Sequence, residues 1–331
     1  MVVKISKLRQ LMQDLPPEAD PTDAAWRGEY IRHMGLDPGD IYQELEMDSP
    51  FVDTHRDESD AASPVNLHSH SFFEIIYCRG ACELEYLVGS RRYRLQKGDV
   101  VIVPPGLSHR PLLFGENSGS YLRDVVWISE EFMHQLRKWF PELLQQSGSE
   151  SMLLRTDDTA REEIDRLFDL GVQEAEKRGE EWEVAVVGNT ITLLTQLHRA
   201  CMDRVAKPMK AEKPEMLDRV LRYIEENLSG KITLADTARH FFVSESTITQ
   251  LFRKKMGVSF YHCVTQRRLI AAKALIDRNV KLEQVGEQVG FTDYSAFYRS
   301  FKKEFGISPA QYRKLQQYES TKHRTIGGHI C

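Results

Sequence analysis

Three histidines and one glutamate are the first residues whose types and spacing could do chemistry. His68, His70 and Glu74 lie in the stretch NLHSHSFFEIIY, and His109 follows the turn-forming stretch VPPGLS. Alternate residues of an extended chain point to the same side, so the first three side chains share one face if this stretch is a strand. Imidazole nitrogens with a carboxylate suit iron, manganese, nickel or zinc. The same groups could instead hydrogen-bond a small molecule or form an internal polar network.

The surrounding residues predict the sheet that must position this group. Between residues 66 and 128, β-branched or aromatic runs such as FFEIIY, CELEYLV, DVVIVP and YLRDVVWI are separated by glycine and proline turns. Short strands at this spacing are typical of an antiparallel barrel or sandwich. An apolar barrel with a few convergent polar groups is a common form of small-molecule site. Tyr86, Arg92 and Trp127 are predicted to line the same interior.

A second group of candidate residues comes from a phrase that occurs twice near the end of the chain. FVSESTITQLFRKKMGVS at 242–259 and GFTDYSAFYRSFKKEFGISP at 290–309 match at an offset of 49 residues over the later helix. Ser244 and Asp293 are good N-caps, and Gly257 and Gly306 suit the left-handed residue that closes a helix. A further apolar pattern precedes each copy. The repeat therefore predicts two helix-turn-helix units.

In such a unit the second helix lies in the major groove, with its N-terminal residues at the base edges. In both copies these residues are small or polar, and a basic pair follows where phosphates could be reached. The helical stretch between the units has about 17 residues and spans about 25 Å. We therefore expect recognition helices about 34 Å apart, one turn of B-DNA, so that one chain reads successive major grooves.

Charge is unevenly distributed along the chain. Residues 211–331 hold 20 Lys+Arg and 13 Asp+Glu, a net of +7 in a chain whose net charge is −5. A basic end on an acidic body indicates that only this end meets a polyanion. No apolar run approaches the roughly 18 residues of a membrane helix, and five scattered cysteines favour a reducing compartment. We expect a cytoplasmic protein without a membrane partner.

Residues 215–314 resemble the DNA-binding domain of AraC/XylS-type transcription regulators. The resemblance is carried by Ile232-Thr233-Leu234, Ser244, Phe252, Gly257, Arg267/Arg268 with Ala271/Ala272, and GFTDYSAFYRSFKKEFGISPAQYR. It implies base contacts in one groove from Ser246, Thr249 and Gln250, and in the next from Ser295, Ala296 and Arg299. The basic residues expected at phosphates are Arg253, Lys254, Lys302 and Lys303.

Gly286 departs from that family pattern, which favours a helix-forming residue such as alanine at this position. A glycine inside a helix costs up to about 1 kcal/mol relative to alanine. We therefore expect the second helix-turn-helix unit to be softer than the first and to contribute less affinity.

The histidine stretch resembles a cupin barrel, with its HxH pattern, its glutamate and the later Gly98, Pro104, Gly106 and His109. Leu113 stands where the motif usually ends in a polar residue. Cupin sensor domains are a common N-terminal partner of this DNA-binding domain. The resemblance implies ligand contacts, or a bound divalent metal, at His68, His70, Glu74 and His109. No cofactor is expected to be required.

Together these features predict an α+β multidomain chain. We expect an N-terminal cupin barrel (double-stranded β-helix or jelly-roll) with a helical dimerisation segment, and a C-terminal all-α domain with tandem helix-turn-helix units. The expected segments are an N-terminal arm with first strands at 1–60, a cupin-like sensor core at 61–130, a helical dimerisation or packing segment at 131–205, a linker at 206–214, an AraC-type DNA-binding domain at 215–316 and a tail at 317–331.

The function expected from this arrangement is ligand-responsive transcription regulation rather than enzymatic turnover. The resemblance favours an activator of carbohydrate-utilisation genes, with double-stranded DNA, a small-molecule inducer such as a sugar, a second copy of the chain and RNA polymerase as partners. One alternative is a constitutive DNA-binding regulator whose barrel only dimerises. Another is a metal-dependent cupin enzyme. The helices at 158–204 could pair between two copies or cover the barrel of one.

Overall fold

The computed structural model describes residues 3–4, 41–42, 47–59, 65, 67–80, 84–113, 120–143, 152–203, 206–209 and 211–316. The tail predicted at 317–331 and most of the predicted N-terminal arm lie outside these residues. Within the arm, β1 (Val3–Lys4) pairs in parallel with β2 (Ile41–Tyr42). Among the described helices, none is long and apolar enough to cross a membrane.

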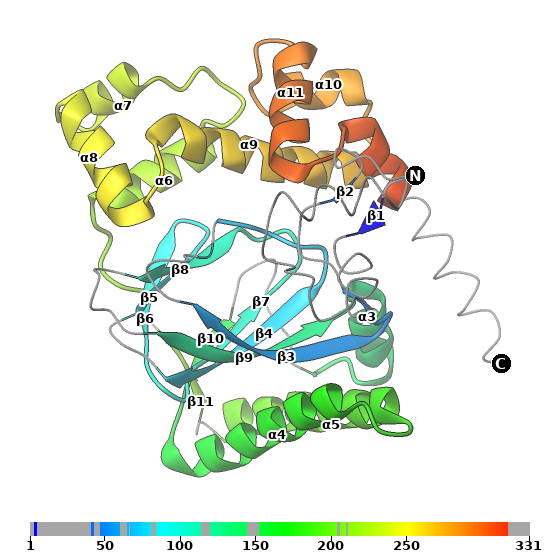
Figure 1. Cartoon of the computed structure of the whole chain (residues 1–331). Coiled ribbons are helices and arrows are strands. Elements are labelled where there is room, and N and C mark those ends of the chain that lie inside the picture. The colour runs from blue at the N-terminus through cyan, green and yellow to red at the C-terminus, as the bar shows by residue number, and fades with distance from the viewer. Residues whose placement is uncertain are drawn as a thin grey trace, which may run out of the picture. The chain divides into compact units, whose positions relative to one another are not determined.

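Two antiparallel sheets form the cupin-like domain, as predicted (Figure 1). The larger sheet has the strand order β11-β10-β7-β4-β9-β3, and the smaller has the order β6-β5-β8. An isolated bridge between His68 and His109 extends the pairing. The strands are β3 (Val52–Ser59), β4 (Phe73–Gly80), β5 (Leu84–Val88), β6 (Arg91–Leu95), β7 (Val100–Val103), β8 (His109–Leu113), β9 (Tyr121–Ile128), β10 (Met152–Thr156) and β11 (Ala206–Pro208).

The two faces of the larger sheet differ because side chains alternate along each strand. Phe73, Ile75 and Tyr77 of β4 belong to an apolar core shared with helices. The helices are α3 (Glu130–Trp139), α4 (Asp158–Lys177) and α5 (Trp182–Met202), and α4 and α5 lie side by side on this face (Figure 1). The segment therefore packs on the sheet, which is one of the two expected arrangements. Pairing between copies stays a prediction.

The other face of the larger sheet looks toward the smaller sheet. Ile76 and Cys78 of β4 form a core with Tyr86 of β5 and Tyr93 of β6. We call this side of both sheets the inner face. Strand register places Glu74 next to Val103 and Trp127, so these three residues belong to the inner face as well.

Two segments differ from the expected boundaries. Residues 152–156 lie in the predicted helical segment but form β10, and residues 206–208 lie in the predicted linker but form β11. Leu153 and Leu154 are both buried, since β10 pairs with β7 on one side and β11 on the other. A short segment that is buried on both faces has no alternating pattern, so its sequence does not distinguish it from a helix.

The first helix-turn-helix unit has the predicted caps. It consists of α6 (Met216–Glu226), α7 (Leu234–His240) and α8 (Glu245–Met256). The Ser244 hydroxyl accepts a hydrogen bond from the Thr247 N–H at 3.1 Å, and Gly257 ends α8 with a φ of 67°. Ile248 and Phe252 are fully buried beneath the helix. Local capping signals therefore set both ends of α8.

The second unit repeats this design with α9 (Phe260–Asp277), α10 (Leu282–Gln288) and α11 (Tyr294–Phe305). The Asp293 carboxylate accepts a hydrogen bond from the Ala296 N–H at 2.7 Å. Gly306 closes α11 in the left-handed conformation, and Phe297 and Phe301 are fully buried. The predicted second helix-turn-helix is confirmed.

Gly286 has a packing role that its helix propensity does not reveal. A Cβ at this position would lie 3.0 Å from the Cβ and 3.2 Å from the Cγ of Phe297. The glycine therefore allows α10 to approach α11 closely, and this contact opposes the softening predicted from propensity. Gly290 is required for another reason: its φ is +91°, and a Cβ there would lie 2.2 Å from the Leu228 carbonyl oxygen.

The described elements fall into two compact units, whose boundary crosses the predicted DNA-binding domain. One unit contains residues 49–226 and 234–260, which include the larger sheet, the smaller sheet and helices α3 to α8. The other contains residues 1–48, 227–233 and 261–331, which include β1, β2, α10, α11 and most of α9. The recognition helices α8 and α11 thus belong to different units, and the expected spacing of 34 Å stays a prediction.

Candidate ligand and DNA-binding sites

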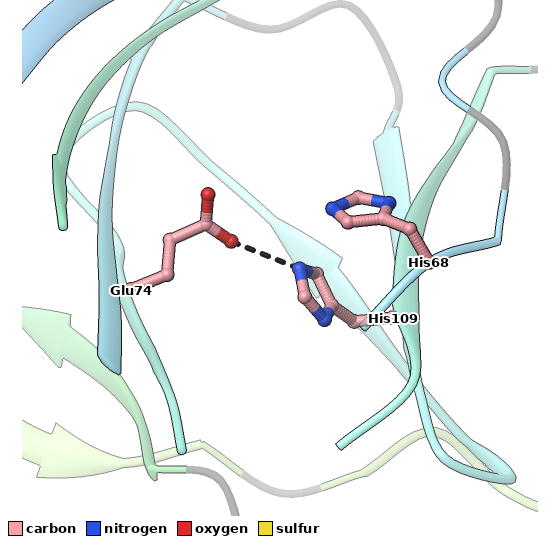
Figure 2. Close-up of side chains that lie close together, drawn as sticks. All are labelled: His68, Glu74 and His109. Atoms are coloured by element: carbon pink, nitrogen blue, oxygen red, sulfur yellow. Dashed lines mark hydrogen bonds and ion pairs between the residues drawn. The ribbon is translucent and has the colours of Figure 1, made fainter. Parts of the chain in front are cut away.

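Glu74 and the predicted histidines converge at one end of the inner face. The Nε2–H of His109 donates to Glu74 Oε2 at 2.9 Å, and Nε2 of His70 lies 3.4 Å from the same oxygen. The rings of His68 and His109 are 4.3 Å apart. Figure 2 shows the His109 ring directed at the Glu74 carboxylate, with the His68 ring beside it. The predicted convergence is therefore present, although β4 begins only at Phe73 and His68 and His70 precede it.

The donor set fits a metal in part. One ligand atom from each of His68, Glu74 and His109 lies within 4.8 Å of the others, whereas His70 is not a member of this trio. Nδ1 of His109 faces the Leu107 carbonyl oxygen at 2.9 Å, and Nδ1 of His70 faces the Phe72 carbonyl oxygen at 2.7 Å. Metal-bound histidines commonly use one ring nitrogen for the ion and the other for such a carbonyl.

Burial and hydrogen bonding shift two pKa values in this cluster. Burial acts to raise the pKa of Glu74, but hydrogen bonds and Coulombic attraction from His109 and His70 hold it well below its ordinary value. Burial lowers the pKa of His70 despite its proximity to Glu74. The lowered pKa favours the neutral ring of His70. Its two nitrogens face acceptors of the protein itself, the Phe72 carbonyl at 2.7 Å and the Glu74 carboxylate at 3.4 Å.

A row of polar side chains continues from this cluster along the inner face, and sequence reasoning missed most of it. Trp127 donates its Nε1–H to Glu74 Oε1 at 2.9 Å, and the His55 ring lies edge-on to Trp127 at 4.7 Å. Nε2 of His55 is 3.4 Å from Asp57, which accepts a hydrogen bond from Arg123 at 3.0 Å. The signal was the two-residue spacing of His55 and Asp57, but only pairing of β3 with β9 brings Arg123 to them.

Two tyrosines lie beside this row. Tyr86 is buried on the inner face with its ring 6.3 Å from that of His109, and its contact with a ligand stays a prediction. Tyr121 is fully buried, and its hydroxyl has no hydrogen-bond partner within the described part of the chain. Burial raises the pKa of Tyr121 well above its ordinary value, so the hydroxyl stays protonated and can donate.

The predicted position of Arg92 is corrected by the strand register. Tyr86 pairs with Tyr93, and Arg92 pairs with Leu87. Arg92 therefore lies on the face of the smaller sheet opposite to Tyr86 and does not line the inner face. A shift of one residue in a strand reverses the side to which a side chain points, and the sequence did not specify this register.

The predicted DNA contacts on α8 are largely accessible. Ser246, Gln250, Arg253 and Lys254 are exposed. Thr249 is only half-buried, and its hydroxyl donates to the Glu245 carbonyl at 2.9 Å. The exposed polar face is opposite to Ile248 and Phe252, as the helical period requires.

On α11 the accessible face carries an additional aromatic pair. Ser295, Arg299, Lys302 and Lys303 are exposed, and Ala296 is half-buried. Tyr294 and Tyr298 are 40% and 37% exposed, with ring centroids 6.3 Å apart. Tyr298 was not among the predicted contacts, although its position four residues after Tyr294 places both on one helical face.

Comparison with known proteins gives the same two domains. Residues 56–180 match the family model of the AraC-like ligand binding domain, and residues 237–315 match that of a helix-turn-helix domain. The arabinose operon regulatory protein of Escherichia coli (strain K12) is 26% identical over 225 residues, covering 67% of this chain and 74% of the relative. The uncharacterized HTH-type transcriptional regulator YfiF of Bacillus subtilis (strain 168) is 26% identical over 265 residues, covering 77% and 80%.

Among solved structures, the C-terminal domain of AraT, a response regulator from Geobacillus stearothermophilus, is 30% identical and covers 29% of this chain and 82% of that chain. Its TM-score is 0.29, so it adds no argument about the fold. The family is shown instead by the two family models, whose matched ranges together span more than half of the chain. The chain has a row of polar side chains on the inner face and one recognition helix in each helix-turn-helix unit. It belongs to the AraC family of ligand-responsive, DNA-binding transcriptional regulators.

Proposed function

We propose that the effector of this regulator is an uncharged, polyhydroxylated small molecule such as a sugar, bound at the inner face. The observation that carries this proposal is charge balance. Arg123 is paired with Asp57 at 3.0 Å, and Glu74 is paired with His109 at 2.9 Å. An organic anion would compete with Asp57 for Arg123 and would be repelled by the Glu74 carboxylate. A neutral ligand leaves both pairs intact.

Groups that suit a polyol lie on the same inner face. The buried Tyr121 hydroxyl is a donor without a partner among the described residues, and Trp127 offers an aromatic surface. A buried polar group without a hydrogen bond costs roughly 1–3 kcal/mol. A ligand hydroxyl that satisfies Tyr121 would recover part of this cost and so stabilise the bound state.

A divalent metal is the second candidate, supported by the convergence of His68, Glu74 and His109 within 4.8 Å. A bound ion would supply positive charge and coordination positions for ligand hydroxyls. Glu74 Oε2 would then exchange its hydrogen bond with His109 for a metal bond, because the present hydrogen bond occupies Nε2. The donor types fit zinc, iron, manganese or nickel equally.

The remaining features of the proposal follow from the family. We propose that the protein acts in the cytoplasm, where its DNA is, and that it activates transcription of carbohydrate-utilisation genes through contact with RNA polymerase. Two copies would pair through the solvent side of the helical layer, where Leu170 of α4 is 39% exposed and Val184 of α5 is 66% exposed. Each chain would present α8 and α11 to successive major grooves.

The ligand class is tested by thermal shift of the full chain against neutral sugars, sugar acids and divalent metals. A ligand that binds only the folded state raises the melting temperature. Neutral sugars should stabilise the wild-type chain, and Tyr121→Phe should reduce the shift, because it removes the buried donor that has no partner among the described residues. Tyr298→Phe, at an exposed position on α11, is the matched control and should keep it.

Each other result supports a different function. Stabilisation by acids alone would contradict the charge-balance argument. Stabilisation by metal alone, with stoichiometric metal in elemental analysis, would assign the cluster to the ion, and turnover of any substrate would favour a cupin enzyme. No response to any class, in a chain that binds DNA, would favour a constitutive regulator whose barrel only dimerises.

A further inference from the structure

Two buried arginines lie on the face of the smaller sheet that points away from the inner face. Arg92 of β6 and Arg110 of β8 are both directly opposite Leu87 of β5. They are 2% and 5% exposed. Arginine keeps its charge in proteins, and a buried charge requires partners. We call this face, with Leu87, Arg92 and Arg110, the outer face.

Arg92 binds the first turn of α6. Its Nε–H and Nη2–H donate to the two carboxylate oxygens of Asp218 at 2.8 and 3.0 Å. Its Nη1–H donates to Glu85 at 2.6 Å, and its Nη2 lies 3.3 Å from a carboxylate oxygen of Glu215. Asp218 is 3% exposed, so this bidentate pair is shielded from water. Such a pair fixes the orientation of both groups because its two parallel bonds restrict rotation.

Arg110 binds the far end of the recognition helix. Its Nη1–H donates to the carbonyl oxygen of Met256, the last residue of α8, at 2.9 Å. The last carbonyls of a helix have no partner within the helix and attract a cation. Ser246 and Gln250, at the other end of α8, remain exposed. The contact therefore holds α8 and leaves its base-reading residues accessible.

The outer face is connected to the ligand cluster through a single strand. His109, which hydrogen-bonds Glu74, and Arg110, which holds α8, are consecutive residues of β8 and point to opposite sides. A ligand that displaced His109 would therefore also move the backbone that carries Arg110. Arg92 is linked in the same way to Tyr93, whose side chain lies in the inner-face core.

We infer that the outer face is a docking surface for the first helix-turn-helix unit, and that Arg92 and Arg110 transmit the state of the histidine cluster to α8. A buried ion pair adds little net stability compared with apolar packing, but it fixes geometry. The docked unit would thus respond to the state of the barrel. The inference rests on the proposed ligand site, where the change would begin. It also rests on the observed contacts of Arg92 and Arg110, through which the change would reach α6 and α8.

Hydrogen exchange in the full chain tests the docking without DNA or ligand. Arg92→Met should make the amides of α6 and of the last turn of α8 exchange about tenfold faster, with β3 and β9 unchanged. Asp218→Asn, which keeps the shape of the side chain, should act in the same direction. Arg94→Met is the matched control, because Arg94 is exposed on the same strand and face. Unchanged α6 and α8 exchange in both variants would overturn the docking.

A double-mutant cycle tests transmission, with a duplex selected in vitro by the wild-type chain as the probe. Glu74→Gln should change the Kd for this duplex by about threefold or more in the wild-type background and leave it nearly unchanged in the Arg110→Met background, which lacks the contact between β8 and α8. An equal change in both backgrounds, or none in either, would overturn the transmission. The exchange experiment contains no ligand, so its result does not depend on whether sugars bind. A chain that fails to respond to sugars would therefore contradict the proposed function without contradicting the docking.

Discussion

Replacing Gly286 by alanine tests whether the mid-helix glycine softens or tightens the second helix-turn-helix unit. Helix propensity favours alanine by up to about 1 kcal/mol. Packing opposes it, because the new Cβ would lie 3.0, 3.2 and 3.3 Å from three atoms of Phe297. Carbon atoms that attract each other are about 3.5–4.0 Å apart. The phenyl ring cannot easily yield, since Phe297 is fully buried with Phe301 at 5.6 Å and Phe291 at 5.5 Å.

Overpacking of a filled core typically costs about 1–3 kcal/mol. Subtracting the propensity gain leaves an expected loss of about 1 kcal/mol for α10 and α11. A chain with two compact units is not expected to unfold in one step, so a global melting curve would not report this loss cleanly. Hydrogen exchange of the intact chain is the suitable assay, and 1 kcal/mol corresponds to about fivefold faster exchange in these helices.

The first unit provides the control. Val243 N–H donates to the Ala238 carbonyl as Phe291 N–H donates to that of Gly286, so Ala238 is the structural equivalent of Gly286. Ala238→Gly should also speed exchange, but in α7 and α8, because it removes a methyl group and adds backbone freedom. Slower exchange of α10 and α11 in Gly286→Ala would refute the packing argument. It would restore the interpretation that the glycine only softens the unit.

The remaining predictions concern DNA contacts and pH. Arg299→Ala should weaken specific DNA binding by about 1–3 kcal/mol and relax one position of the site; an unaltered base preference in a selection experiment would remove Arg299 from base readout. Lys302→Ala should weaken binding to all sequences and reduce the salt slope by about one, and a titration with wild-type slope would exclude a phosphate contact. The pKa of His70 is lowered by burial, so its contribution to stability is complete above about pH 6.5 and declines as the pH falls below that value. The pKa of Glu74 is also lowered in the folded state, so its contribution is present above about pH 4.3 and is lost as the pH falls toward the folded value. The denaturant midpoint of the sheet domain's own unfolding step should therefore decline between pH 7 and 5, and His70→Gln should reduce this decline. An equal decline in that variant would contradict the His70 assignment.

Local features of the sequence were sufficient for the helix-turn-helix units. Ser244 and Asp293 cap their helices, and Gly257 and Gly306 end them, because caps depend on residues within one turn of the chain. The convergence of His70 and Glu74 was also predictable, since only four residues separate them. His109 was found through the pattern of turns that precedes it.

The register between distant strands was decided by the tertiary structure. Pairing of β3 with β9 brought Asp57 to Arg123, and pairing of β5 with β6 placed Arg92 on the outer face, where Asp218 of α6 meets it. Nothing within a few residues of Arg92 specifies a partner 126 positions away. The sequence alone determined where the recognition helices α8 and α11 begin and end, because their caps rest on short-range hydrogen bonds. Which side chains share the ligand face, and which hold the first DNA-binding unit, depended on long-range pairing, in which a shift of one residue exchanges the two faces of a strand.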